Sequence, residues 1–214
     1  MRHLLIAGLI CASSFASAAT FNESTDATGG DAGETISTAQ DVTSILGAIE
    51  ASDSITGAID QGADLYRFTF SGGLFTAQTF ATGTTIDTQL FLFNEDGTGI
   101  IANDDIVGQG TLQSLVTATL SAGTYLLGVS TFDNDPVTAG GDEIFPNTFR
   151  ALVTPNNAGD VLASFQSPAG STGSYTIDFS GTVAVPVPAA LPLALAGLGL
   201  LLGIGRRRVS QTIA

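Results

Sequence analysis

The side chains best suited to chemistry are oxygen-bearing residues in two short stretches, each expected to lie beside strand ends. The first group consists of Asp87, Asn103, Asp104 and Asp105. The second consists of Asp133, Asn134 and Asp135, followed in the same expected loop by Asp142 and Glu143. Hard cations such as Ca²⁺ take about six to eight oxygen ligands, usually from loops. We therefore predict Ca²⁺ ligands at Asp87, Asn103, Asp104, Asp105, Asp133 and Asp135.

Neither group has the spacing of an EF-hand loop, which requires a central glycine and a distal glutamate. A local explanation is equally available from the sequence. Asp and Asn are common in turns because their side chains hydrogen-bond the neighbouring backbone. Cation binding and turn formation therefore both stay open at this point.

Few residues of the chain suit acid–base or nucleophilic catalysis. The single histidine, His3, and the single cysteine, Cys11, lie in a segment expected to be removed, and there is no lysine. These absences exclude Ser-His-Asp triads and histidine-bound zinc within the mature chain. We predict a non-enzymatic protein with no catalytic residue and no required cofactor, and with Ca²⁺ as its candidate ligand. A carbohydrate-active enzyme with two carboxylates is the remaining enzymatic alternative.

Charge is distributed unevenly along the chain. All 20 acidic residues lie between Glu23 and Asp178, where Arg67 and Arg150 are the only basic residues, so this region carries a net charge of −18. Such a surface repels nucleic acid and anionic lipid headgroups. Nucleic acid is therefore not an expected partner. The excess of carboxylates attracts divalent cations, or it only keeps the surface solvated.

The first 19 residues have the pattern of a secretory signal peptide. Arg2 and His3 precede an apolar run over residues 4–11, and small residues end the segment in Ala16-Ser17-Ala18-Ala19. A charged start, a short apolar core and an A-x-A-like site are typical of export signals. We expect cleavage after Ala18 or Ala19 by the export machinery.

The last segment, residues 183–214, has the pattern of a membrane span. Seventeen uncharged residues run from Ala189 to Gly205, and three arginines follow them directly. This length is at the short end of what crosses the hydrocarbon of a bilayer. Because cations are retained in the cytoplasm, we expect an inner-membrane-anchored precursor with its C-terminal end inside and its acidic domain outside.

Between these ends the sequence predicts strands. From Ser54 onward, short apolar and polar residues alternate between turn-forming residues, which is typical of half-buried strands. Expected strands cover residues 65–70, 75–79, 89–93, 115–120, 125–129 and 175–179. The run 89–93 is apolar enough to be buried on both faces. The predicted fold is all-β, a single antiparallel, jelly-roll-like β-sandwich over residues 54–182. It is preceded by a flexible lead over residues 20–53, in which one short helix or turn is expected around residues 38–49.

The C-terminal segment resembles the sorting tails that exosortases read in Gram-negative bacteria, the PEP-CTERM superfamily. Its proline-rich entry is similar to the variant written VPLPA, with Val187 in place of leucine, and lacks the glutamate of the PEP form. The resemblance implies processing by an exosortase-like enzyme, followed by release or transfer to the cell surface. A plain anchor that is never cut is the alternative. The matching residues are Val185, Pro186, Pro188, Pro192, Arg206, Arg207 and Arg208.

The middle region is similar to bacterial pre-peptidase C-terminal (PPC) domains, which are β-sandwich modules of secreted proteins. The likeness rests on the order of six stretches: residues 64–68, 87–93, 102–105, 120–125, 133–136 and 173–177. It implies a binding or structural module of the extracellular matrix or envelope, with extracellular polysaccharide as a candidate partner. A calcium-dependent adhesin and a carbohydrate-binding module are alternatives.

Overall fold

The computed structural model describes residues 17–27, 30–60, 62–80, 82–108, 112–147, 151–166 and 172–183. Two short helices accompany the strands: α1 (Glu23–Asp26) and α2 (Thr43–Leu46). The strands are β1 (Thr20–Asn22), β2 (Gln40–Asp41), β3 (Ala48–Ile49), β4 (Ser54–Ile59), β5 (Ala63–Phe70), β6 (Gly73–Thr79), β7 (Thr88–Asn94), β8 (Gly99–Asn103), β9 (Leu115–Leu120), β10 (Gly123–Thr131), β11 (Pro136–Val137), β12 (Ser164–Phe165) and β13 (Gly173–Val183). The fold is all-β, as the sequence predicts.

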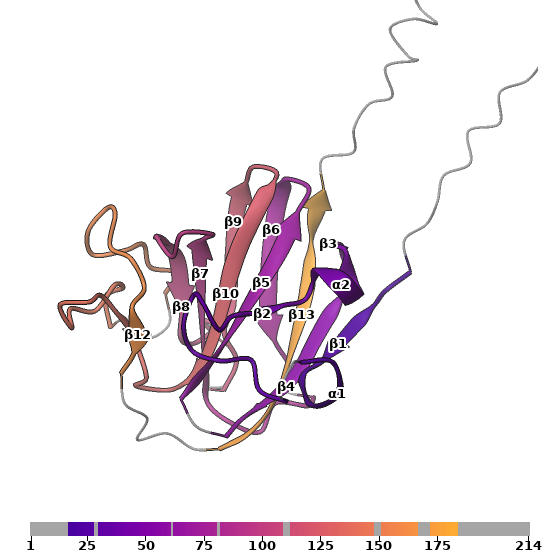
Figure 1. The fold of residues 1–214 in the computed structure, drawn as a ribbon, viewed down its shortest axis with the longest axis horizontal. Coiled ribbons are helices and arrows are strands. Elements are labelled where there is room, and N and C mark those ends of the chain that lie inside the picture. Colours follow the sequence, from indigo (N-terminus) through magenta and orange to yellow (C-terminus); the bar gives the residue numbers. More distant parts are fainter. Residues whose placement is uncertain are drawn as a thin grey trace, which may run out of the picture. The chain divides into compact units, whose positions relative to one another are not determined.

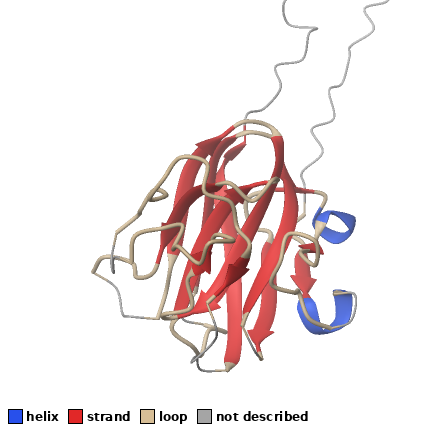
Figure 2. Ribbon diagram, turned by 60° about the vertical axis from the view of Figure 1, so that its left-hand side comes forward, coloured by secondary structure: helices blue, strands red, loops and turns tan. Residues whose placement is uncertain are grey.

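The strands form two large sheets and one small one (Figures 1 and 2). The first sheet has the order β1-β4-β13-β6-β9, and the second has the order β2-β5-β10-β7-β8 with β3 also on β5. β11 and β12 pair separately. Pairing among the long strands is antiparallel, as expected, whereas β1, β2 and β3 each add to a sheet in parallel. All six of the strand ranges expected from the sequence lie within observed strands.

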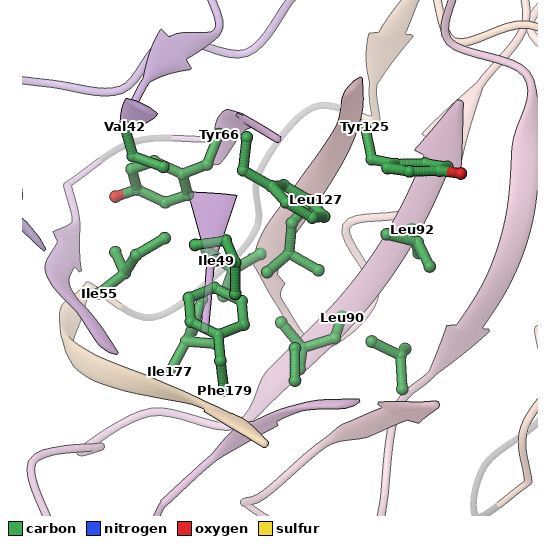
Figure 3. Close-up of a cluster of buried hydrophobic side chains, with 14 of the residues drawn as sticks. Val42, Ile49, Ile55, Tyr66, Leu90, Leu92, Tyr125, Leu127, Ile177 and Phe179 are labelled. Atoms are coloured by element: carbon green, nitrogen blue, oxygen red, sulfur yellow. The ribbon is translucent and has the colours of Figure 1, made fainter. Parts of the chain in front are cut away.

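The main core contains the inward-facing residues of both large sheets. Phe68 of β5 stacks on Phe75 of β6 with ring centroids 5.1 Å apart, which joins the second sheet to the first. Figure 3 shows Leu92 and Leu127 of the second sheet in the same buried cluster as Ile177 of the first. Alternate residues of a strand face the same side, so the period of two in the sequence corresponds to this buried face.

The second sheet is buried on its outer face as well. Phe91, Phe93 and Leu126 form a second apolar cluster with residues of the long segment between β10 and β13. The covering side chains include Phe145 and Phe165, which contact the ring of Phe91 at centroid distances of 5.8 and 5.9 Å. This cover explains why residues 90–93 are all buried, which confirms the prediction for that run.

The segment 20–53 was expected to be a flexible lead with one short helix or turn around residues 38–49. The structure has α2 in that range, but it also gives the segment a second helix and three short strands. Phe21, Val42 and Ile49 are at most 2% exposed and belong to the main core. Few large apolar residues occur in this segment, so its composition resembles that of a linker. Those few residues nevertheless bury fully, and strand pairing with β4 and β5 orders the backbone.

Both targeting segments lie largely outside the described residues. Of the expected signal peptide, only residues 17–19 are described, and of the expected sorting tail only residue 183. The sorting residues from Val185 to Arg208 therefore remain predictions. In the described part of the chain, no helix has the length and apolar character needed to cross a membrane.

Candidate metal centre

The ends of three neighbouring strands lie together at one end of the second sheet. β7 begins at Thr88, which pairs with Thr131 at the end of β10, while Leu90 pairs with Asn103 at the end of β8. Asp87 therefore lies beside the residues that follow β8 and β10. The backbone N–H of Phe132 donates to the carbonyl of Asp87 at 3.0 Å, which fixes this arrangement.

Three acidic residues meet there and a fourth, Asp135, lies nearby; we call these four the loop cluster: Asp87, Asp104, Asp105 and Asp135. Carboxylate oxygens of Asp87, Asp104 and Asp105 lie within 4.8 Å of one another. Asp135 is close enough to raise the pKa of Asp104 by charge repulsion. The two groups predicted separately from the sequence thus contribute to a single site.

Several buried oxygens of this site have no hydrogen-bond partner. Asp104 and Asp135 are 7% and 5% exposed, yet Oδ1 of Asp104 and Oδ2 of Asp135 accept no hydrogen bond. The same is true of Oδ1 of Asp87, Oγ1 of Thr131 and Oδ1 of Asn134. Buried polar atoms are rarely left unpaired because desolvation costs about 1–3 kcal/mol each, and more for charged groups. These oxygens are therefore available to a cation.

The electrostatics of the loop cluster favour a positive ligand. Burial, with repulsion from Asp105, Asp87 and Asp135, raises the pKa of Asp104 to about 7. Burial also raises the pKa of Asp135 to about 6, against the hydrogen bond from Gln89. The pKa of Asp87 is raised by burial and by Asp105. In the described part of the chain the one basic side chain, Arg67, binds elsewhere, at 3.6 Å from the Glu95 carboxylate.

A small cavity adjoins these residues. Its volume is about 10 Å³, and Asp104, Asp135 and Gln89 are among the residues that line it. About this volume is needed for a single water-sized occupant. The cavity therefore suits an ion or a water molecule and is far too small for a sugar ring.

Other polar residues hold the loop cluster in place. The side-chain amide of Gln89 donates to Oδ1 of Asp135 at 3.1 Å. Asn103 was predicted as a ligand, but its Oδ1 accepts the N–H of Leu115 at 2.9 Å and its Nδ2 donates to the carbonyl of Asp105 at 3.0 Å. Asn103 thus positions the loop after β8. The other predicted ligand, Asp133, is an exposed turn residue with φ of 64°.

A second buried acidic group, not predicted from the sequence, lies near the N-terminal strand, and we call it the tyrosine cluster: Glu23, Asp64, Tyr66 and Tyr175. The Tyr175 hydroxyl donates to Oδ2 of Asp64 at 2.7 Å, and the Tyr66 hydroxyl donates to Oε1 of Glu23 at 3.1 Å. The two hydroxyl oxygens also contact each other, and because each hydroxyl has a single proton, this third hydrogen bond forms when one of the two carboxyl groups is protonated. All four residues are at most 3% exposed.

The tyrosine cluster has backbone donors as well. Glu23 accepts the N–H of Ala32 at 3.0 Å and the N–H of Ala58 at 2.8 Å. Burial, together with the nearby Glu23, raises the pKa of Asp64 to about 8 despite the Tyr175 hydrogen bond. Burial also raises the pKa of Glu23. Asp64 and Tyr66 are two positions apart in β5 and therefore face the same side of the sheet. This spacing is the one feature of the sequence that could have indicated the tyrosine cluster.

Comparisons with known proteins do not assign the chain to a family. No family model matches it, and no curated protein matches it. Its function must therefore be inferred from its own residues and geometry.

Proposed function

We propose that the chain is an exported, non-enzymatic β-sandwich module of jelly-roll type that serves the extracellular matrix or envelope. A Ca²⁺ ion bound by the loop cluster holds the long segment after β10 against the second sheet. The C-terminal segment anchors the precursor in the inner membrane and is processed by an exosortase-like enzyme. The PPC-like order of motifs and the tail motifs support the extracellular part of this proposal.

One observation carries the calcium proposal: buried oxygens without hydrogen-bond partners converge from three strand ends. Ca²⁺ binds oxygen ligands at about 2.3–2.6 Å, so two oxygens on one ion lie at most about 5 Å apart. The separation of 4.8 Å or less among Asp87, Asp104 and Asp105 agrees with this limit. The candidate ligands are oxygens from loops, a donor set typical of Ca²⁺ rather than of zinc or copper.

The proposed ion would also have a structural role. Asp135 directly precedes β11, and its carbonyl accepts the N–H of Gln166 at 2.8 Å, next to β12. Asp135, one of the proposed Ca²⁺ ligands, thus lies near the start of the long segment and is hydrogen-bonded to a residue near its end. Neutralising the repulsion around Asp135 would keep Phe145 and Phe165 on the apolar outer face of β7.

The shapes of the hollows support a non-enzymatic role. The cavity beside the loop cluster has room for one small species, as described above. A larger hollow of about 300 Å³ lies beside Glu23, and none of the described residues that line it has an aromatic side chain on which a sugar could stack. The proposal therefore assigns no catalytic residue.

A calcium-dependent adhesin is the second candidate, because exposed apolar residues flank the loop cluster. Val107 follows the Asp104–Asp105 pair and is 73% exposed, and Phe132, next to Asp87, is 41% exposed. If the native protein binds polysaccharide in Ca²⁺ but not in EDTA, and the Val107→Ser variant does not bind in Ca²⁺, this candidate is favoured. If the native protein and the variant bind polysaccharide equally well in both buffers, it is contradicted.

The test of calcium binding is thermal unfolding of the purified protein in EDTA, Ca²⁺ or Mg²⁺. A ligand at about one hundred times its Kd stabilises the folded state by about 2.7 kcal/mol, which raises the Tm of a domain this size by about 5–10 °C. Asp104→Asn should abolish the shift in Ca²⁺. Asp142→Asn, an exposed position in the same long segment, is the matched control and should keep it. An unchanged Tm at millimolar Ca²⁺ would contradict the proposal.

A further inference from the structure

A buried carboxylate lies beside the first described residues and is not part of either acidic cluster. Asp53, directly before β4, is 2% exposed. Its Oδ1 accepts the backbone N–H of Ala19 at 2.9 Å, and its Oδ2 accepts the N–H of Glu50 at 2.8 Å. Both hydrogen-bond donors that the described residues provide to the Asp53 carboxylate are therefore uncharged backbone groups. A carboxylate can accept about four hydrogen bonds, so Asp53 has capacity for a cation.

The nitrogen of Ala19 is held firmly against Asp53. The carbonyl of Ala19 accepts the N–H of Ser54 at 2.9 Å. The next residue, Thr20, begins β1 and pairs with Ser54 in the parallel ladder (Figure 1). Ser17 and Ala18 are exposed. The chain thus leaves the folded domain between Ala18 and Ala19.

This exit point coincides with one of the two cleavage positions expected from the sequence. We propose that the signal peptide is cut after Ala18, and that the new α-ammonium of Ala19 forms a partly buried ion pair with Asp53. Water is the co-reactant: its oxygen adds to the Ala18 carbonyl carbon, the peptide bond to Ala19 breaks, and the released nitrogen takes up protons. The inference rests on the export part of the proposed function.

The physical reason is charge. Before cleavage, the uncharged Ala19 amide donates one hydrogen bond to the Asp53 carboxylate. After cleavage, the same nitrogen carries a full positive charge, and the attraction between two opposite charges is stronger than that between a charge and an amide dipole. Cleavage one residue later would remove this nitrogen and leave Oδ1 of Asp53 without its donor. Processing at Ala18 therefore strengthens the folded domain.

The first measurement is N-terminal sequencing of the exported protein, which should begin at Ala19. A chain that begins at Thr20 would overturn this inference and leave export standing. A chain that retains Met1 would overturn both.

The second measurement isolates the charge. Because the chain contains no lysine, an amine-directed acetylating reagent, followed by hydroxylamine to remove esters, modifies the α-amino group alone. Acetylation keeps one N–H on Ala19 but removes the charge. It should lower the Tm of the exported protein by about 3 °C and should change the Tm of the Asp53→Asn variant much less. Equal losses in both proteins would overturn the ion pair.

A third measurement does not depend on the variant. In the native exported protein, the α-amino group should react with the reagent at least about tenfold more slowly than in urea, because it is engaged by Asp53 and a protonated amine is not nucleophilic. Equal rates, after correction for a free alanine peptide in the same two solvents, would overturn the inference even if Asp53→Asn fails to fold.

Discussion

The two buried acidic clusters are made from the same kind of residue but are satisfied in different ways. In the tyrosine cluster, hydroxyl and backbone N–H groups donate to Asp64 and Glu23. In the loop cluster, oxygens of Asp87, Asp104 and Asp135 lie buried without a donor. A carboxylate pair supplied with donors is complete in itself and can also be neutralised by a proton. Buried oxygens without donors can take up a proton or a cation, and for this reason we propose a binding role for the loop cluster and a structural role for the tyrosine cluster.

The largest expected effect comes from disturbing the complete cluster sterically. A methyl group on Gly57 would lie 2.3 Å from the Tyr175 hydroxyl and 2.6 Å from Oε2 of Glu23. We expect Gly57→Ala to lower the free energy of unfolding by about 3 kcal/mol, because the rigid ring cannot move aside. Urea denaturation measures this. Gly123→Ala, where the nearest atom is at 3.6 Å, is the control, and a similar loss there would contradict the steric explanation.

Removal of one hydroxyl should have a smaller effect. Tyr175→Phe deletes the donor to Asp64 and the partner of Tyr66, so we expect a loss of about 2 kcal/mol in urea denaturation. Tyr125→Phe is the matched control, because its hydroxyl makes a single hydrogen bond, to the carbonyl of Ser121 at 2.9 Å. It should lose about 1 kcal/mol or less. If Tyr125→Phe proves the more costly change, the tyrosine cluster does not have the role we assign to it.

The smallest and most selective effect is on pH dependence. The folded-state pKa values of Asp135, Asp104 and Asp64 are raised to about 6, 7 and 8. An unfolded Asp has a pKa of about 4, so the folded protein binds these protons more tightly. Their stabilisation is complete below about pH 4 and is lost as the pH rises through the folded-state values. In EDTA, the Tm should therefore fall between about pH 4 and pH 8.

The same titration distinguishes the clusters. Ca²⁺ should offset the loss at Asp104 and Asp135, because it replaces protons there, and leave the loss at Asp64 in place. Asp64→Asn should remove the part of the decline that reaches pH 8, whether or not Ca²⁺ is present. Asp142→Asn, an exposed change, tests the contribution of overall charge and should leave the profile nearly unchanged. A flat profile in EDTA would contradict the assignments for both clusters.

Local patterns predicted much of the fold. The alternation around Phe68 and Phe70 and the apolar run from Leu90 to Phe93 both lie in observed strands. The segment 20–53 was misjudged because its order comes from pairing with β4 and β5, which are distant in sequence. The composition of this segment therefore gives little indication that its backbone is ordered.

For the candidate site, residue types alone led to the predictions of oxygen ligands and of a non-enzymatic role, and they established the strongly acidic composition. Which carboxylates share a site was decided by strand register, since Thr131 pairs with Thr88 and brings Asp135 to Asp104. Asn103 and Asp135 look equivalent in sequence, yet one has its oxygen occupied by Leu115 and the other retains an unpartnered oxygen. Hydrogen-bond partners depend on which backbone groups lie within about 3 Å, and only the folded chain determines that.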